Sequence, residues 1–365
     1  RSRMRAFILV SPLLAFIAIF FVVPIIDMLY RSVENTIVEE VLPNTVVELG
    51  QWDPGLGELP PEAVFVALQK DMVKGFKAKT LGRLARRLNY DKPGMSSLFR
   101  KSGRRSKRMT GEDMRGQFLK LDKRWGDLTT WGLIKRESDP LTASYFLAAV
   151  DMRYNEKGEM TNQPEERQIY ANLFVRTILM SLGITFLCVL LGYPVAYLLS
   201  TLPMRTSSLL MILVLLPFWT SLLVRTTSWI ALLQTQGVLN DLMVVAGLLS
   251  DDGRVQLIHN KIGTFIAMTH ILLPFMILPL YSVMKTIPPS YMRAARSMGA
   301  SPALAFFKIY MPNTIPGIGA GGILVFILAI GYYITPALVG GQSGTFISNF
   351  IADHVSTTLN WGLAA

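Results

Sequence analysis

Four long stretches of the sequence contain no charged residue, and they constrain the fold more than any other feature. They cover residues 6–26, 177–204, 262–284 and 309–352. Each reaches the roughly 20 apolar residues that an α-helix needs to cross a bilayer. A fifth apolar stretch, residues 206–233, is interrupted only by Arg225. We therefore predict an all-α polytopic membrane protein with five transmembrane helices.

The composition excludes several other classes of protein. The chain has 365 residues, of which 51% are hydrophobic and 17% are charged, so a soluble single domain is disfavoured. One cysteine, Cys188, lies within a predicted span, which excludes an internal disulfide and a cysteine zinc site and predicts a packing role. The net charge of +11 is concentrated in one segment and in loops beside the spans, which does not favour a nucleic-acid partner.

The two ends of the sequence also carry information. Arg1, Arg3 and Arg5 precede the first apolar stretch, which is longer than the core of a signal peptide and is therefore predicted to be a retained span. The apolar run at residues 361–365 is typical of the beginning of another helix, so we expect a sixth span beyond Ala365.

The charges of the short loops predict the orientation. With the N-terminus in the cytoplasm, the inner loops hold Arg205 and the cations between Lys285 and Lys308, without an acid in that interval. The outer loop near residues 241–261 is mixed in charge. This is the positive-inside pattern, and it places the loop at residues 285–315 in the cytoplasm.

A polar insertion, residues 30–170, separates the first two spans and is long enough to be a small domain. Weak helical periodicity predicts helices near residues 61–76, 77–89, 110–121 and 141–152. Residues 74–108 contain thirteen Lys or Arg and one acid, Asp91. Two interpretations are open: a surface for anionic lipid headgroups or an acidic partner, or a solvated basic face without a ligand.

The loop between the last two predicted spans has the signals of a capped helix-turn-helix. Ser290 is expected to cap a first helix, and Gly299 stands where a helix C-terminus requires a left-handed residue. Ser301 and Pro302 are expected to open a second helix, which Pro312 and Pro316 would end. A compact, capped element between two spans is typical of a surface for a partner.

The sequence contains no constellation that indicates catalysis. His259, His270 and His354 are widely spaced, and there is no paired-carboxylate, metal-binding or phosphate-loop motif. We therefore predict that the chain is not an enzyme and holds no metal or cofactor. If it works against a gradient, ATP must be hydrolysed by another chain.

At this loop the sequence resembles the permease subunits of bacterial ATP-binding-cassette importers. Their cytoplasmic motif reads Glu-Ala-Ala, three residues, Gly, nine residues, then Ile-x-Leu-Pro. Ala294, Ala295 and Gly299 match its first part, while Arg293 stands where the family usually has Glu. The second part is matched by Ile309 and Pro312, with Met311 in place of Leu.

The resemblance implies a role for this loop. Arg293, Ala294, Ala295, Gly299, Ile309 and Pro312 are the positions that would contact a cytoplasmic ATPase, which would bind the ATP and magnesium. The family further implies an ATPase dimer, a second permease, an external solute-binding protein and a location in the bacterial inner membrane. Residues 1–29 would be the cytoplasmic N-terminus with the first span, 30–170 an extracytoplasmic insertion, and 171–365 the permease core.

Within that family, residues 172–361 resemble most closely the spermidine/putrescine permeases, on the stretches 190–199, 216–230 and 333–341. The long insertion is not usual in those permeases. The resemblance implies a polyamine pathway, for which the candidate side chains are Trp219, Thr220, Arg225, Thr226, Trp229, Tyr332, Tyr333 and Thr335.

The role of several of these residues is open. Aromatic rings can stack on a cationic amine, although aromatic residues near helix ends are also common interface anchors. Arg225 would repel a polyamine, so packing against a carbonyl or a partner subunit is favoured over a role as a ligand. The spans contain no deep acid, so carboxylates for a polyamine would have to come from the second permease.

Three alternatives remain. The chain could serve an importer of the same class for another small organic solute, such as an opine or an amino acid derivative. It could be an ATPase-independent secondary transporter, although the acids expected for ion coupling are scarce. It could also be a membrane-anchored scaffold whose working part is the basic insertion.

Overall fold

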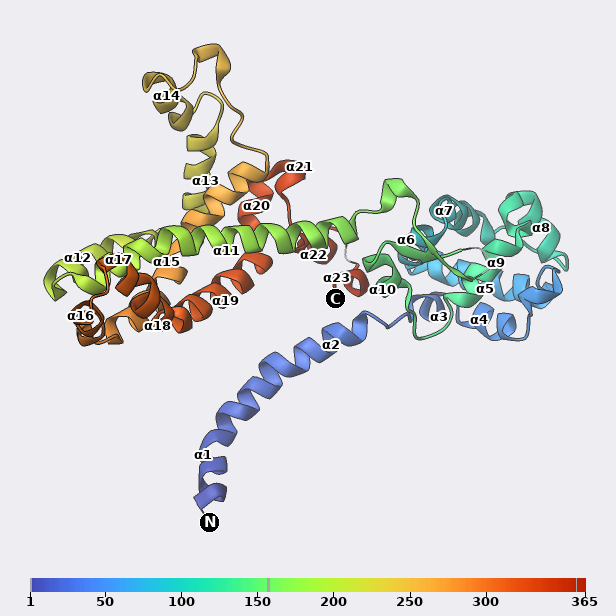
Figure 1. The fold of residues 1–365 in the computed structure, drawn as a ribbon. Helices are drawn as coiled ribbons and strands as arrows, with labels where there is room; N and C mark the ends of the chain where they lie inside the picture. Colours follow the sequence, from blue (N-terminus) through green and yellow to red (C-terminus); the bar gives the residue numbers. More distant parts are fainter. Residues whose placement is uncertain (1, 156–157, 359) are drawn as a thin grey trace. The chain divides into compact units, whose positions relative to one another are not determined.

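A computed structural model describes residues 2–155, 158–358 and 360–365. The chain is almost entirely α-helical, which confirms the predicted fold class (Figure 1). Among the described residues, β1 (Met152–Tyr154) and β2 (Met160–Asn162) form one antiparallel hairpin in which Arg153 is opposite Thr161. The contacts divide the chain into two units, Arg1–Ala171 with Thr358–Ala365, and Asn172–Thr357.

The first unit begins with a long apolar helix. α1 (Ser2–Ile17), a π-helical turn η1 (Ala18–Val22) and α2 (Val23–Arg31) follow one another without a break. Phe7–Arg31 is long and apolar enough to cross a membrane, and none of its apolar window is buried in the protein. This helix corresponds to the first predicted span.

The insertion is a bundle of short helices. Its elements are α3 (Ile37–Val41), α4 (Pro43–Gly50), η2 (Pro54–Leu56), α5 (Glu62–Lys77), α6 (Leu81–Asp91), α7 (Met95–Ser106), α8 (Met114–Leu121), η3 (Lys123–Gly126), α9 (Leu128–Arg136), α10 (Ser144–Ala149) and η4 (Glu165–Arg167). The same unit includes α23 (Trp361–Ala364), in which Gly362 lies against the Tyr145 ring. The four helices predicted for the insertion correspond to α5, α6, α8 and α10.

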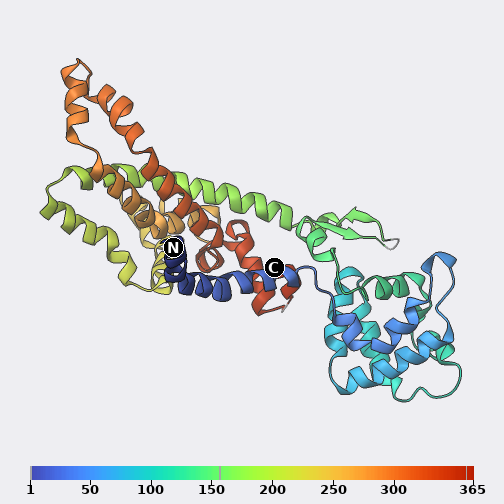
Figure 2. The same ribbon diagram turned by 90° about the horizontal axis from the view of Figure 1, so that it is seen from below.

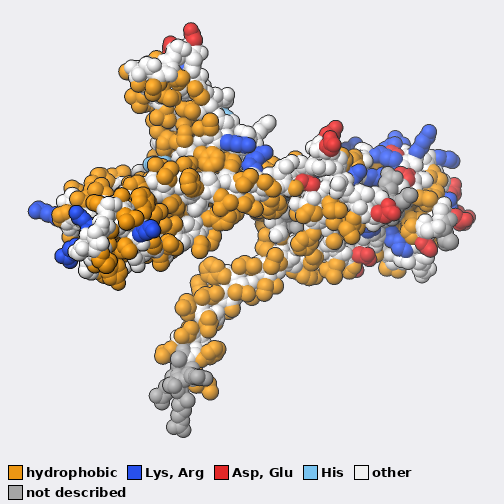
Figure 3. Space-filling view, viewed as in Figure 1, with side chains coloured by type: hydrophobic (Ala, Val, Ile, Leu, Met, Phe, Trp, Pro, Cys, Tyr) orange, Lys and Arg blue, Asp and Glu red, His pale blue; other side chains and the backbone are white. Residues whose placement is uncertain are grey.

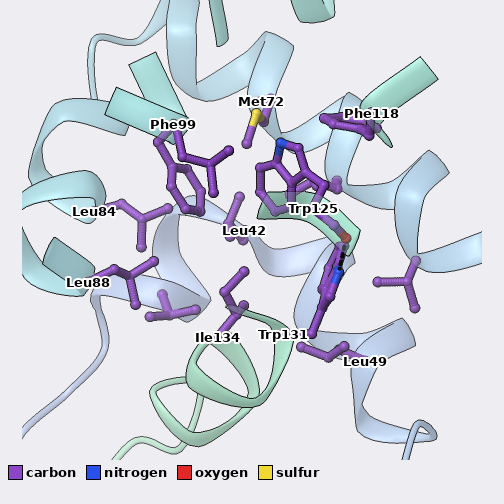
Figure 4. Close-up of a cluster of buried hydrophobic side chains, with 14 of the residues drawn as sticks. Leu42, Leu49, Met72, Leu84, Leu88, Phe99, Phe118, Trp125, Trp131 and Ile134 are labelled. Atoms are coloured by element: carbon purple, nitrogen blue, oxygen red, sulfur yellow. Dashed lines mark hydrogen bonds between the residues drawn. The ribbon is translucent and has the colours of Figure 1, made fainter. Parts of the chain in front are cut away.

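The insertion has a hydrophobic core of its own (Figure 4). Trp125 and Trp131 are fully buried at its centre, with ring centroids 5.3 Å apart. The indole of Trp131 donates to the main-chain oxygen of Trp125, and that of Trp125 donates to Ser102 Oγ. Both indole N–H groups are thus satisfied, as buried Trp requires. Aliphatic and aromatic side chains from six helices surround them, including Leu42, Leu49, Met72, Leu84, Leu88, Phe99, Phe118 and Ile134.

A buried ion pair joins helices within the insertion. Glu137 and Arg87 are nearly inaccessible to solvent and bind each other, and Arg87 also contacts Asp91 at 2.7 Å. Burial raises the pKa of Glu137, against the opposing effect of Arg87. The amide of Asn35 donates to the main-chain oxygen of Glu137 at 2.8 Å, which fastens the entry of the insertion to this pair.

The second unit contains the remaining spans (Figures 1 and 2). Its elements are α11 (Tyr170–Thr201, beginning in the first unit), α12 (Met204–Leu215), η5 (Leu216–Trp219), α13 (Leu222–Leu233), α14 (Val238–Val245), η6 (Asp251–Gly253), α15 (Lys261–Thr286), α16 (Pro289–Ser297), α17 (Pro302–Ala305), η7 (Phe306–Tyr310), α18 (Met311–Asn313), α19 (Ile315–Gly331), α20 (Ile334–Val339), α21 (Gly341–Gly344) and α22 (Ile347–Ser356).

Not all predicted spans are single helices. Three described helices are long and apolar enough to cross a membrane, and five spans result if each of two bent pairs counts as one. The stretch 206–233, expected as one helix, bends by 94° between Met204–Trp219 and Leu222–Val245. Pro217 and the Ser221 N-cap, whose Oγ accepts from the Val224 amide, account for the break.

The long charge-free stretch 309–352 is also divided. Only Ile315–Gly331 within it is a long helix, and the segment Pro302–Asn313 precedes it at an angle of 57°. Beyond Tyr332 the chain folds into the short helices α20, α21 and α22. The absence of charged residues in this stretch therefore indicates burial or contact with lipid, but it does not predict the length of a helix.

α15 lies at the centre of the second unit and meets its neighbours at glycines. A Cβ built on Gly321 of α19 would lie 3.2 Å from the Met276 main-chain oxygen, and one on Gly317 would lie 3.0 Å from Val283 Cβ. On the α11 side, a Cβ built on Gly192 would lie 3.2 Å from Met276 Cγ. α15 and α19 therefore approach closely at Gly317 and Gly321. Such contacts matter because lipid supplies no hydrophobic force between helices.

This packing predicts the effect of enlarging Gly321. We expect Gly321→Val to destabilise the detergent-solubilised protein by about 1–3 kcal/mol, because the added groups overpack the α15 backbone. Gly319→Val is the matched control, since no atom lies within 4 Å of a Cβ at Gly319 of the same helix. The measurement is the thermal unfolding midpoint. Equal midpoints for the two variants would contradict the packing described here.

Candidate functional site

The loop between α15 and α19 forms a helix-turn-helix. α16 begins at Pro289 after the extended Pro288, so the expected N-cap at Ser290 is wrong by two residues. Gly299 has φ +88°, which confirms the left-handed residue expected there. The amides of Gly299 and Ala300 donate to the main-chain oxygens of Arg296 and Ala295, which closes the end of α16.

The second half of the loop is longer than a single helix. The Ser301 hydroxyl accepts from the Leu304 amide at 3.3 Å, and Pro302 occupies the first turn of α17, as expected. The helix then continues through the π-helical turn η7 into α18. Pro312 lies inside α18 and does not end it, because a proline is tolerated in the first turn of a helix. The chain changes direction at Thr314.

The exposed face of α16 is a surface of small, basic and apolar side chains. Ala294, Arg293 and Arg296 are exposed, and Met298 beyond the helix end is 82% exposed. Ala295 is buried at 4% exposure, so it packs within the loop while Ala294 faces outward. Lys and Arg gather at this end of the second unit in Figure 3. In the second half of the loop, Ile309 is partly buried and Pro312 is exposed.

An aromatic cluster connects this loop to α11. The Phe306 ring of η7 stacks on Tyr310 with centroids 5.6 Å apart, and it meets Tyr197 and Tyr193 of α11 edge-on at 5.3 and 6.2 Å. The hydroxyls of Tyr193 and Thr314 are 3.2 Å apart. Because these contacts come from both elements, a displacement of the loop would be transmitted to α11.

A second group of polar residues lies among the membrane helices. The hydroxyls of Thr226 (α13) and Thr335 (α20) are both buried and 3.3 Å apart. One turn from Thr226, the Trp229 indole donates to His270 Nδ1 of α15 at 3.1 Å. These contacts join three helices through side chains that can all form hydrogen bonds.

Arg225 lies in the same region and leaves part of its guanidinium unpaired. Its Nε atom is buried and has no hydrogen-bond partner among the described residues. The guanidinium is within electrostatic range of His270 and Tyr332. The structure therefore brings Arg225, Thr226, Trp229, Tyr332 and Thr335 into one region.

The other sequence candidates lie differently. Trp219 is 82% exposed and Thr220 is also exposed, at the bend between η5 and α13. The Tyr333 ring is about half exposed, while its main-chain oxygen accepts from the Asn349 amide at 2.7 Å. These three side chains are therefore exposed at the surface of the chain.

His270 is a candidate that the sequence analysis did not single out. It is one of three widely spaced histidines, and spacing alone offered no reason to select it. The available signal was its position inside an otherwise uncharged span, where an ionisable side chain indicates a functional site.

Comparison with known proteins identifies relatives of this half of the chain. Residues 178–360 match the family described as "Binding-protein-dependent transport system inner membrane component". The spermidine/putrescine transport system permease protein PotB of Haemophilus influenzae is 35% identical over 193 residues, which are 53% of this chain and 67% of that protein.

Two Escherichia coli proteins show similar coverage. The spermidine/putrescine transport system permease protein PotB is 34% identical over 197 residues, 54% of this chain and 71% of that protein. The inner membrane ABC transporter permease protein YdcU is 32% identical over 204 residues, 53% of this chain and 65% of that protein. The family match over residues 178–360 includes both the helix-turn-helix and the polar region.

The aromatic cluster yields a testable prediction. Phe306→Ala should loosen the loop from α11, because each aromatic pair contributes about 0.5–1.5 kcal/mol beyond its buried area. We expect faster amide hydrogen exchange in residues 289–305 of the variant. Phe307→Ala is the matched control, since the neighbouring Phe307 ring is 62% exposed. Unchanged exchange in Phe306→Ala, or equal acceleration in both, would argue against the connection.

Proposed function

This chain belongs to the family of binding-protein-dependent transport system inner membrane components, and from that premise we propose that it is the permease subunit of an ATP-driven importer for polyamines. The observation that supports the solute class most directly is the 34–35% identity to PotB proteins across the permease half. The permease itself would carry out no covalent chemistry. It would alternate between inward-open and outward-open states as a partner ATPase closes and reopens.

We place the ATPase contact on α16. Its exposed Ala294 allows close approach, and Met298 offers an apolar contact beside it. The partner would be a cytoplasmic ATPase dimer that holds the ATP and magnesium. Arg293 and Arg296 favour acidic side chains on the facing ATPase surface. Most members of the family have Glu at the position of Arg293, so the charge offered to the ATPase at this position is reversed.

The remaining partners follow from the same proposal. A second permease would complete the translocation path, and an external solute-binding protein would deliver the solute. The basic loop around α16 then lies in the cytoplasm, the chain begins in the cytoplasm, and the insertion faces the other side.

The proposed path uses aromatic faces and hydroxyls. Trp229 can offer its ring to an amine, at about 0.5–2 kcal/mol per cation–π contact. Thr226 and Thr335 can accept hydrogen bonds from ammonium groups. Only four acids, Asp241, Asp251, Asp252 and Asp353, occur in residues 172–357, and none is in α11, α15 or α19. Carboxylates that neutralise a polyamine would come from the second permease.

One observation favours a second candidate within the same class. The buried, unpartnered Nε of Arg225 would suit a carboxylate, which an opine or amino acid derivative carries. A polyamine lacks such a group. The charge preference at Arg225 therefore separates the two candidates.

Replacing Arg225 provides the corresponding test. For a polyamine, we expect Arg225→Gln to retain uptake and to lower the spermidine KM by roughly threefold to tenfold, because removal of the cation relieves about 1 kcal/mol of repulsion. Arg205→Gln, an exposed cation outside this region, is the control and should leave KM unchanged. The measurement is labelled spermidine uptake by the reconstituted complex. Loss of uptake in Arg225→Gln, with carboxylated solutes but no polyamine competing, would support the second candidate instead.

The ATPase contact is tested at Ala294. Ala294→Trp should reduce association with the ATPase and ATP-dependent uptake by about tenfold or more, since the indole would hold the surfaces apart. Ala294→Ser keeps the side chain small and should behave as the unsubstituted chain. Association is measured by co-purification from detergent. Uptake that persists without any ATPase would refute the importer mechanism and favour a secondary transporter.

A further inference from the structure

The insertion exposes a continuous row of cations along α7. Leu98, Phe99 and Ser102 of this helix point into the core and are completely buried. The opposite side bears exposed Arg or Lys side chains, and Figure 3 shows Lys and Arg gathered over α7 and α8. We name this area the basic surface and define it by Arg100, Arg104, Arg105, Lys107, Arg108 and Lys120.

The cations of the basic surface are not neutralised by ion pairs with the described part of the chain. One acid of the insertion, Asp122, is already engaged: it binds Lys101 and Arg124, and hydrogen bonds from Arg124 hold its pKa well below the usual range. Among the residues that the structure describes, no carboxylate forms an ion pair with any member of the basic surface. The surface therefore has a large unbalanced positive potential.

A hollow at one edge of the basic surface has the chemistry of a phosphate site. Arg105, Arg108 and Lys120 line a cavity of about 520 Å³, together with Gln117 and two apolar side chains. No acid lines it. Guanidinium groups bind phosphate oxygens in pairs, and an ammonium adds a point charge, so the lining suits a phosphate group.

The other edge of the basic surface carries an exposed aromatic ring. Phe76 is about half exposed and lies between Lys74 and Lys77 in sequence. A Cβ at Gly103 of α7 would be 3.3 Å from Phe76 Cδ2, so the ring packs beside α7 at the buried Gly103, which precedes the exposed Arg104. An apolar ring beside several cations is typical of surfaces that enter the headgroup region of a bilayer.

Hydrogen bonds hold both ends of the insertion. Asn35 lies four residues after the end of α2, and its main-chain N–H donates to the main-chain oxygen of Pro140 at 2.9 Å. At the other end, the Asp151 carboxylate accepts from the amides of Ile169, Tyr170 and Ala171, which caps the start of α11. The insertion follows the candidate span Phe7–Arg31 directly in the chain, so a bilayer crossed by this helix would bring lipid headgroups, its most abundant anions, within reach of the insertion.

We propose that the basic surface binds the phosphate groups of anionic phospholipids in the membrane that the chain's own spans cross. The dispersed cations match a continuous anionic sheet, the hollow accepts one headgroup, and Phe76 reaches the apolar boundary. An acidic protein would also match the cations. It would leave without a role the exposed Phe76 ring and the membrane span that directly precedes the insertion. Free phosphate would use the hollow alone.

The test uses the full chain in its complex, reconstituted into vesicles. A fluorophore is attached to a Thr110→Cys variant, because Thr110 is exposed beside the hollow and the native Cys188 is buried. Quenching by a headgroup-labelled lipid is compared between phosphatidylcholine vesicles and vesicles in which about a third of the lipid is phosphatidylglycerol. We expect at least threefold stronger quenching with phosphatidylglycerol, and its loss in about 1 M NaCl, where charges are screened beyond roughly 3 Å.

Charge removal identifies the responsible residues. Arg105→Gln with Arg108→Gln should weaken lipid docking by roughly fivefold for each charge. The matched control removes the same charge from exposed positions elsewhere on the insertion, with Lys70→Gln and Arg167→Gln, and should retain the quenching. Unsubstituted-like quenching in the first variant would overturn the proposal. So would quenching that is independent of phosphatidylglycerol, that inorganic phosphate abolishes at constant ionic strength, or that appears only when the solute-binding protein is added.

Discussion

The permease half depends on the close contact of α15 with its neighbours. Backbone groups in a bilayer must be satisfied within helices, so helices associate through shape rather than through exclusion of water. Glycines of α11, α19 and α21 face α15, as does Gly340 at the end of α20, and substitutions at Gly340 or Gly344 would meet Thr264 Oγ1 at 2.6 Å. α15 is therefore the helix against which the others are fixed.

This arrangement gives the helix-turn-helix its mechanical connections. α15 ends at Thr286, and α16 begins at Pro289, so only two residues separate the central helix from the exposed helix. The other side of the loop is linked to α11 by Phe306 and Tyr310. A force on α16 thus reaches the two longest helices of this unit along separate routes. The π-helical turn at η7, where such turns often mark functional sites, lies on the second route.

Hydropathy located the candidate spans but did not predict their shapes, for a physical reason. A window of apolar residues reports the cost of transfer into lipid, which is the same for a straight helix and for a bent pair. Pro217 and Ser221 contained the signal for the bend in the third predicted span, but a charge-free criterion does not read it. In the insertion, the sequence pattern did not predict α7. The many cations of this segment masked the periodicity of the buried Leu98 and Phe99 on the other side of the helix.

Within the candidate sites, the sequence predicted the features that local backbone chemistry determines and missed those that tertiary packing determines. The turn at Gly299 was predictable because local backbone chemistry determines it. Which of two adjacent alanines faces outward, and which aromatic residue meets His270, depend on tertiary packing that one sequence does not contain. The same limit applies to charge. A single cation, Arg225, suggests repulsion of an amine, yet its effect depends on groups across the path. Because residues 172–357 provide so few acids, the electrostatics of the path is a property of the assembled transporter and cannot be assigned to this chain alone.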